Sequence, residues 1–262
     1  MTKATRHVAW LRVALGVALL AIWQYGSLIP VVGKFPLFDP FVVSSPREVL
    51  RALWKLFVEQ DFARHVLLTL SSTAAALVMG IAGGFVLALL FHNVTALRRI
   101  FSPFLQFFNT LPRVVLAPFL LLAFGTGVLP RVLMATSFIV FLVYFNVLYG
   151  LTRIDEAQYR HVRMLGGSRL DQCLTLQIPV GFAWVIRAFP HAVAYGFVGT
   201  VFQEFVGGDS GIGSVMIYGL NELNSAVVMA TVVILSLLGW LLFWLGSYVG
   251  QASAPWRREL GI

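Results

Sequence analysis

Three polar side chains inside one apolar run are spaced so that they could line a path for an anion. Arg187, His191 and Tyr195 lie four residues apart, so on a helix they share one face. A cation inside a membrane is energetically costly and usually faces a cavity or a partner. Two interpretations fit the stripe. Either it lines a translocation path, or Arg187 has a structural role, paired with Glu204 or backbone carbonyls or reaching an interface.

A second polar pair, Asn109 and Arg113, lies one helical turn apart in another apolar run. The same two interpretations apply to it. Glu204 is the one acidic residue inside an apolar run, where it could pair with a basic residue at a gate or reach water. The candidate lining residues of a translocation path are therefore Asn109, Arg113, Arg187, His191, Tyr195 and Glu204.

No arrangement typical of an enzyme active site occurs in the apolar runs. Paired carboxylates, a nucleophile elbow and the His/Glu spacing of a metal site are absent from them. A phosphate-binding loop needs Gly-Lys followed by Ser or Thr, and Lys3, Lys34 and Lys55 do not fit it. Cys173 is the single cysteine, which excludes an intrachain disulfide. We expect no enzyme activity, no catalytic residue, no metal and no cofactor.

The elements that position these residues must be membrane-spanning helices. The 262 residues are 59% hydrophobic and only 11% charged, whereas a soluble domain carries roughly 25% charged residues. The net charge of +8 does not indicate nucleic-acid binding, because the basic residues cluster at the ends of apolar runs, as in membrane proteins. We predict an all-α polytopic membrane protein with a single domain, residues 1–262.

A membrane-spanning helix needs about 20 mostly apolar residues. The predicted spans are residues 10–32, 66–92, 103–124, 130–151, 179–206 and 226–250. We expect the first to be a retained span, because no convincing cleavage site follows it. The third contains Pro112 and Pro118, and the fifth contains Pro190. These two should face protein or a cavity, where the freed carbonyls find partners.

The distribution of Lys and Arg sets the predicted orientation. With the N-terminus inside, the inner loops hold Lys3, Arg6, Arg12, Arg98, Arg99, Arg153, Arg160, Arg163, Arg169, Arg257 and Arg258. The outer loops hold the smaller set of Lys34, Arg47, Arg51, Lys55, Arg64 and Arg131. Because basic residues favour cytoplasmic loops, both termini are predicted to be cytoplasmic.

Residues 46–60, in the outer segment between the first two spans, are predicted to form an amphipathic helix. Ser45 suits the N-cap, Pro46 suits the first helical position and Glu48 would complete a capping box. One face carries Val49, Leu50, Leu53, Trp54 and Phe57, and the other carries Arg47, Arg51, Lys55 and Glu59. The helix either lies on the outer membrane surface or packs on other spans.

The most informative polar stretch is the inner loop, residues 153–179. Residues 155–165 are predicted to form a short helix, which Gly166-Gly167 interrupts. Ser168 then caps a second helix, with Asp171 as the reciprocal acid. The apolar stripe of this helix consists of Leu170, Leu174 and Ile178, and Pro179 should end the unit and start the next span. Two short helices joined at a bend would form a knob suited to docking with a soluble partner.

The inner loop resembles the EAA loop of bacterial ABC importer permeases. Gly166-Gly167-Ser168-Arg169 and Leu176-Gln177-Ile178-Pro179 keep the family's spacing from glycine to proline. The Glu-Ala-Ala positions of the family are Arg160-His161-Val162 here, so a base replaces the acid. The resemblance implies docking to an ATPase subunit through Arg160, His161, Val162, Gly166, Gly167, Ser168, Leu176, Ile178 and Pro179. Gly166 is expected to adopt positive φ, which only glycine accepts at little cost.

Motifs along most of the chain resemble the nitrate, sulfonate and taurine branch of that family. They are Ser44-Ser45-Pro46 with Glu48-Val49-Leu50, Asn109-Thr110-Leu111-Pro112-Arg113 with Ala117-Pro118, Phe124-Gly125-Thr126-Gly127, and Glu204 with Gly208-Asp209-Ser210-Gly211-Ile212-Gly213. Their order and spacing together favour the ABC importer superfamily. The glycine-rich turn after Glu204 is no phosphate-binding loop, because it lacks a lysine.

The resemblance implies a multi-pass permease subunit of the bacterial inner membrane. Its partners would be a second permease subunit in a homodimer or heterodimer, the homodimer being expected, two cytoplasmic ATPase subunits that bind the ATP, and a periplasmic solute-binding protein. The two intramembrane arginines and the branch favour a small anionic solute resembling a sulfonate, nitrate or taurine. The alternatives are a membrane enzyme and an ion-coupled secondary carrier, which usually places several acids near the midplane.

Overall fold

The computed structural model describes residues 3–25 and 40–252, and these residues form helices and short connections without any strand. The elements in chain order are α1 (Lys3–Tyr25), α2 (Pro40–Val43), α3 (Pro46–Glu59), α4 (Phe62–Asn93), α5 (Thr95–Thr110), a 3₁₀ turn η3 (Arg113–Val115), α6 (Leu116–Phe124), α7 (Val128–Leu151), α8 (Glu156–Met164), α9 (Arg169–Gln172), a π-helical turn η4 (Cys173–Gln177), α10 (Ile178–Gly207), α11 (Ile212–Asn221) and α12 (Ser225–Ala252).

The all-α polytopic architecture predicted from the sequence is confirmed. Among the described helices, the stretches containing α4, α7, α10 and α12 are long and apolar enough to cross a membrane. Helices α5 and α6 would together make a fifth crossing, bent by 81°. The first predicted span, residues 10–32, falls partly on α1 and partly on residues outside the described ranges.

The prediction of one continuous helix over residues 103–124 is wrong. Helix α5 begins earlier, at Thr95, and ends at Thr110. Leu111 then adopts an extended conformation, with φ −61° and ψ 129°, because the ring of Pro112 disfavours helical geometry at the preceding residue. The chain resumes as η3 and α6, so Arg113 lies at a sharp bend rather than inside a straight span.

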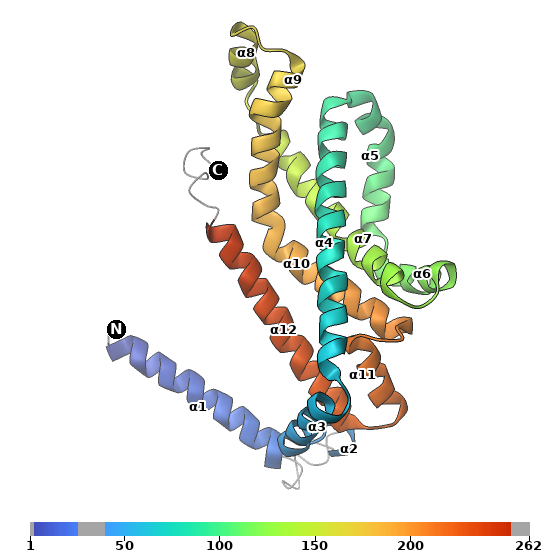
Figure 1. Ribbon diagram of the computed structural model, residues 1–262. Coiled ribbons are helices and arrows are strands. Elements are labelled where there is room, and N and C mark those ends of the chain that lie inside the picture. Colours follow the sequence, from blue (N-terminus) through green and yellow to red (C-terminus); the bar gives the residue numbers. More distant parts are fainter. Residues whose placement is uncertain (1–2, 26–39, 253–262) are drawn as a thin grey trace.

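The core of the subunit is the contact between α4, α7 and α10, which lie side by side in Figure 1. Fully buried side chains at this contact include Ala76, Ala135, Ile139, Val143 and Ala192. Small residues let the helix backbones approach closely, which strengthens van der Waals packing where lipid supplies no hydrophobic driving force. At Gly84 of α4, an added Cβ would lie 2.7 Å from the backbone oxygen of Val140 in α7.

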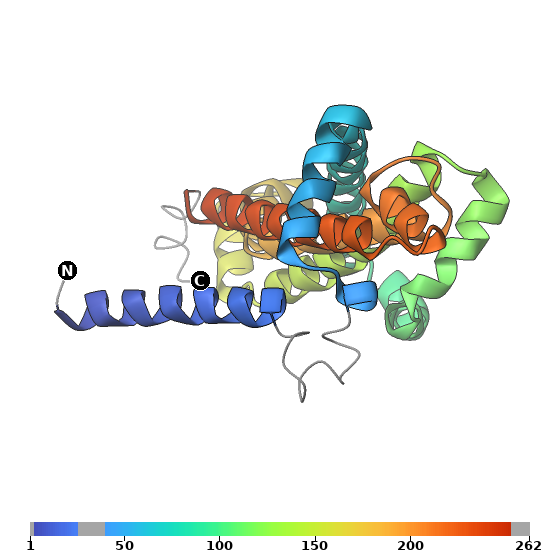
Figure 2. The same cartoon turned by 90° about the horizontal axis from the view of Figure 1, so that it is seen from below.

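Helix α3 starts where the sequence predicted, with the Ser45 hydroxyl accepting the Glu48 N–H. The Glu48 carboxylate accepts a hydrogen bond from the Ser44 hydroxyl. Val49 and Leu56 are buried against a cluster that includes Ile212 and Ala230, so α3 packs on the other helices. The buried face is rotated from the predicted apolar face, since Leu50 and Trp54 remain exposed. Figure 2 shows α3 crossing this end of the molecule.

Helix α1 extends away from the rest of the subunit and contacts it through its C-terminal end (Figure 1). The indole N–H of Trp23 donates to the carbonyl of Ser44, and the side-chain oxygen of Gln24 accepts the N–H of Arg47. Trp10, Leu11 and Leu15 are exposed. The apolar surface of α1 therefore lies open to lipid or to another subunit.

The two adjacent glycines of α4 provide a matched test of close helix packing. Gly84→Ala should destabilise the protein by about 1–3 kcal/mol, because its Cβ would overlap the backbone of α7. At Gly83 the nearest atom to an added Cβ is Cγ2 of Val140 at 3.5 Å, an ordinary contact. Gly83→Ala should be neutral or stabilising by up to about 1 kcal/mol. Thermal unfolding of both variants in detergent would test this, and equal midpoints would contradict it.

Candidate functional site

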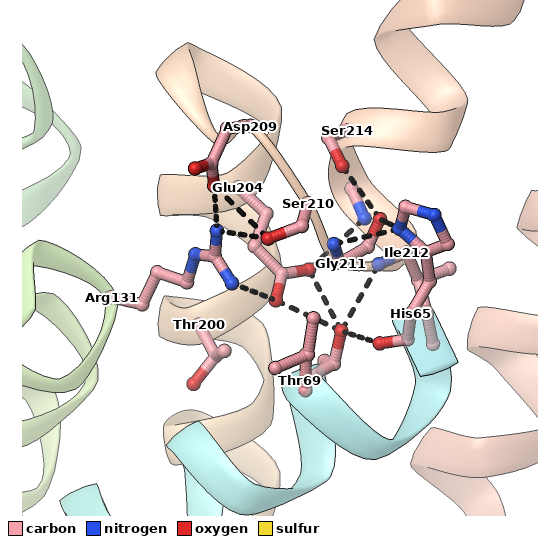
Figure 3. A network of polar contacts seen from close by, with 12 residues as sticks. His65, Thr69, Arg131, Thr200, Glu204, Asp209, Ser210, Gly211, Ile212 and Ser214 are labelled. Atoms are coloured by element: carbon pink, nitrogen blue, oxygen red, sulfur yellow. Dashed lines mark hydrogen bonds and ion pairs between the residues drawn. The ribbon is translucent and has the colours of Figure 1, made fainter. Parts of the chain in front are cut away.

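A buried carboxylate, that of Glu204 in α10, forms the centre of a polar network at the end of the bundle that carries α3 and α11 (Figure 3). Its side chain is fully buried. The Thr69 hydroxyl lies 2.9 Å from both carboxylate oxygens and also accepts the N–H of Ile212 at 3.0 Å. The Gly213 N–H donates to Oε2 at 3.1 Å. These contacts tie α4 to α10 and to the start of α11.

The glycine-rich turn after α10 is shaped to enclose this carboxylate. At Gly211, which has a φ of +103°, an added Cβ would lie 2.1 Å from the Glu204 carboxyl carbon. At Gly213 it would lie 2.5 Å from the backbone oxygen of Val201. The Gly211 N–H also donates to Nδ1 of His65 at 3.0 Å. The glycines are therefore required by close approach to Glu204 and to the α10 backbone.

Arg131, at the start of α7, supplies the positive charge of the network. Its side chain is 1% exposed. It donates to Asp209 at 2.5 Å and to the Ser210 hydroxyl at 2.9 Å, and it lies 4.0 Å from the Glu204 carboxylate. The sequence interpretation placed Arg131 among outer loop residues and missed this role. The sequence feature that could have indicated this pairing is a lone acid, Glu204, near the end of one span and an arginine, Arg131, beside the start of another.

The stripe of Arg187, His191 and Tyr195 is exposed along one face of α10. The guanidinium of Arg187 lies 4.8 Å from the Trp184 ring centroid, and His191 stacks edge-on against Phe243 of α12. Glu204 does not join this stripe, because it is buried in the network with Arg131. The suggested pair between Arg187 and Glu204 is therefore not formed in the described subunit.

Asn109 and Arg113 meet at the bend between α5 and α6. Arg113 donates to the Asn109 side-chain oxygen at 2.7 Å. Its guanidinium lies over the rings of Phe138 and Phe141 in α7, at 5.3 and 5.0 Å from their centroids. The structure thus joins Asn109 to Arg113 at this bend and sets the pair against α7.

The inner loop has the local structure that the sequence predicted, at the opposite end of the bundle from α11 (Figure 1). Asp155 caps α8 by accepting the Ala157 N–H, and the chain reverses at Gly166 with a φ of +80°. Ser168 and Asp171 form a complete capping box at α9. Hydrogen bonds from the Ser168 hydroxyl and N–H keep the pKa of the Asp171 carboxyl below its ordinary value.

The two halves of the loop pack closely at its glycines. An added Cβ at Gly167 would lie 2.6 Å from Cγ1 and 2.8 Å from the carbonyl oxygen of Val162, so these positions are in direct contact. Arg160 and His161 are exposed beside them. Leu170 and Leu174 are exposed, whereas Leu176 and Ile178 are half-buried.

Pro179 lies at the start of the next span, as predicted, but it does not separate the loop from that span. Helix α9 continues through η4 into α10, and Pro179 lies in the first turn of α10. The Ile178 N–H donates to the carbonyl of Cys173, five residues back, which is the spacing of a π-helical turn. Pro179 has no N–H to donate to the preceding turn, and the helix passes this point with a π-helical turn directly before it. The loop is therefore joined to the α10 span by continuous helix.

Comparison with known proteins gives relatives along nearly the whole chain. The chain is similar to a probable ABC transporter permease protein of Haemophilus influenzae, with 26% identity over 83% of this chain and 85% of that protein. It is similar to a putative aliphatic sulfonates transport permease protein, SsuC, of Escherichia coli, with 25% identity over 91% of this chain and 90% of that protein. These likenesses agree with the resemblance to the sulfonate, nitrate and taurine branch.

The fold is similar to that of a chain in an inward-facing structure of the MetNI methionine ABC transporter. The TM-score is 0.64 at 19% identity, and the match covers 73% of this chain and 95% of that chain. Residues 80–258, well over half of the sequence, match the family model described as binding-protein-dependent transport system inner membrane component. Together with its apolar helices, this makes the protein a multi-pass membrane permease subunit and not an enzyme. The chain belongs to the family of binding-protein-dependent transport system inner membrane components, the permease subunits of ABC importers.

Proposed function

We propose that this permease subunit forms the translocation path for a small anionic solute, delivered by a periplasmic binding protein and driven by a separate ATPase that docks on residues 153–179. Family membership implies the binding protein and the ATPase. The observation that carries the proposal is the rigid pair of short helices α8 and α9, held at an angle by Gly166 and Gly167 and continuous with the α10 span.

The surface of the inner loop supports docking to a soluble partner. Its exposed apolar side chains are Met164, Leu165, Leu170 and Leu174. Contiguous apolar side chains outside a membrane usually mark an interaction site. Arg160 and His161, at the positions of the family's Glu-Ala-Ala motif, are exposed on α8. A partner surface for this loop would combine an apolar groove with an acidic group or a carbonyl facing Arg160.

The polar face formed by Arg113, Tyr195, His191 and Arg187 supports an anionic solute. Within the described residues, the Arg113 Nε–H is buried and has no hydrogen-bond acceptor. A charged donor in an apolar setting is stabilised by an anion. Arg187, His191 and Tyr195 are exposed on α10. A second copy opposite this stripe would enclose a path, so we propose a homodimer. The sulfonate permease relative is consistent with such a solute. Glu204, a candidate path residue, is assigned a structural role.

An ion-coupled secondary carrier is the less favoured function. Carriers of that class usually need acids near the midplane that can exchange an ion with water. Glu204 is held by Thr69, Gly213 and Arg131 and is fully buried. Co-purification with an ATPase would support the importer, and solute uptake by the chain alone would support the carrier.

The first prediction from this proposal concerns docking. Gly166 has positive φ, and no described atom lies within 4 Å of the Cβ that a side chain would add. Gly166→Val should therefore act through the backbone alone and misalign α8 and α9, whereas Gly166→Asn should be tolerated, because Asn accepts positive φ. We expect Gly166→Val to insert normally but to lose ATPase binding and stimulated ATP hydrolysis. Arg160→Glu should also impair binding. Normal binding and stimulation in both Gly166→Val and Arg160→Glu would refute docking.

A second prediction concerns the path. Arg113→Gln removes the charge but keeps a side chain that can donate to Asn109, so uptake of the anion should fall by roughly tenfold, as expected for losing a hydrogen bond to a charged group. Arg187→Gln should weaken uptake as well. Arg99→Gln, at an exposed position in α5, is the control and should leave uptake unchanged. The proposal fails if transport per assembled complex is normal in both path variants.

The third prediction concerns orientation, which we propose from the basic residues that gather in the loop 153–179 and its neighbours. Both termini and this loop are placed in the cytoplasm. In a Cys173→Ser background, a membrane-impermeant maleimide added to intact cells should label Ser210→Cys. It should label Ser168→Cys only after lysis. Labelling of Ser168→Cys in intact cells would show that the loop lies outside, the reverse of the proposed orientation.

A further inference from the structure

The inner end of α4 is fastened to the loop 153–179 by a reciprocal pair of amides. Asn93, the last residue of α4, donates through Nδ2 to Oε1 of Gln177 at 2.7 Å. Gln177 donates through Nε2 to Oδ1 of Asn93 at 3.0 Å. The Gln177 side chain is buried, with the residue 4% exposed, while Asn93 is exposed. Each amide thus satisfies the other in a fixed geometry, and the buried partner has little access to water.

A second contact fastens the other half of the loop to the same helix end. Nε2 of His92 lies 3.1 Å from the hydroxyl of Tyr159 in α8. Tyr159 is half-buried, and its hydroxyl also interacts with the Gln177 side chain. Both limbs of the loop, α8 and η4, therefore meet two consecutive residues of α4. Two separate contacts thus join the loop to the same end of α4, which a single chance surface contact would not produce.

The backbone around Gln177 is unusual in a way that points to a role. Gln177 ends the π-helical turn η4, in which the Ile178 N–H bonds five residues back. A π turn shifts the register of side chains along a helix, and such turns are frequent at functional sites. Here the shifted register lies where the loop becomes the α10 span, and the side chain at its end is the one that contacts α4.

Helix α4 is not next to the loop in the sequence. The loop follows α7 and leads into α10. Its other end carries Thr69 and His65, which hold Glu204 and Gly211. The stretch of α4 from Thr69 to Asn93 corresponds to about 36 Å of straight helix. A displacement of the loop would reach that distant network through α4 only if the loop and α4 move together.

We propose that Asn93 and Gln177, supported by His92 and Tyr159, form an amide clamp that makes α4 follow the loop during the transport cycle. Asn93 and Gln177 are positioning residues, since they transmit movement rather than touch solute or nucleotide. The inference rests on the proposed docking of the ATPase at the loop. It adds that the movement enters the bundle through α4 as well as through the covalently attached α7 and α10.

The test measures the distance between α4 and α8 in the assembled importer. Spin labels would be attached at Val86→Cys and Gln158→Cys, both exposed positions, in a Cys173→Ser background. Distances are recorded without nucleotide and after trapping with ATP and vanadate. In the otherwise native protein we expect one narrow distance within each subunit, separate from the distances between the two copies, that is the same in both states. In Asn93→Ala we expect the trapped state to lose that narrow distance, while ATPase binding persists.

Three further variants separate a clamp from general damage. Thr175→Ala removes an exposed hydroxyl that bonds only within the loop among the described residues, and should behave as native. Exchanging the partners, Asn93→Gln with Gln177→Asn, should restore the narrow distance. Asn93→Ala with Gln177→Ala should be no worse than either change alone, because paired residues are not additive. If Asn93→Ala lowers the amount of complex, Asn93→Asp keeps the size and the acceptor and should show a partial loss.

The clamp is refuted if Asn93→Ala and Asn93→Asp keep the narrow distance in the trapped state, or if Thr175→Ala loses it equally. These outcomes differ from failure of the docking proposal. Docking fails when Gly166→Val and Arg160→Glu retain ATPase binding and stimulated hydrolysis. The two proposals are therefore tested by different variants and different measurements: docking by ATPase binding and stimulated hydrolysis, and the clamp by the distance between the labels in the Asn93 variants.

Discussion

The close approach of α4, α7 and α10 is the constraint on which the rest of the subunit depends. In lipid, helices gain little from hydrophobic burial against one another, so association relies on van der Waals contact and internal hydrogen bonds. Glycines at the contact bring backbones together, as at Gly84 against Val140 and at Gly199 against Ala135. Once these three helices are fixed, their ends meet at both ends of the bundle. One end carries the polar network around Glu204, and the other carries the contact between Asn93 and Gln177.

The cluster around Glu204 shows how a membrane protein accommodates a buried charge. An unpaired carboxylate in this environment would be strongly unfavourable, so its oxygens need donors in a fixed arrangement. Thr69 and Gly213 provide donors, and Arg131 provides opposite charge at 4.0 Å. Because these groups come from α4, α7, α10 and the start of α11, satisfying one carboxylate also fixes the relative position of four elements. A substitution there would affect the assembly of the whole end of the bundle.

The residues that we propose for the solute path and for docking lie in parts of the subunit that this core leaves free. Arg113 lies half-buried at a proline-induced bend, over aromatic rings of α7. The loop 153–179 projects from the opposite end to the Glu204 network, and its exposed leucines contrast with the buried Gln177 at its base. A packed core that joins an exposed polar stripe on α10 to a projecting loop is the arrangement that the proposed function requires.

The sequence by itself determined the features that depend on neighbouring residues. Apolar length predicted the spans that contain α4, α7, α10 and α12, and local hydrogen-bonding rules predicted the caps at Ser45 and Ser168. The backbone freedom of glycine predicted the positive φ of Gly166. Only the tertiary structure decided which distant groups meet. Arg131 is far from Glu204 in sequence, and Asn93 is far from Gln177, so no local rule pairs them. The enclosing role of Gly211 likewise appears only when helix packing brings the turn against a carboxylate, because burial and charge pairing are set by three-dimensional proximity.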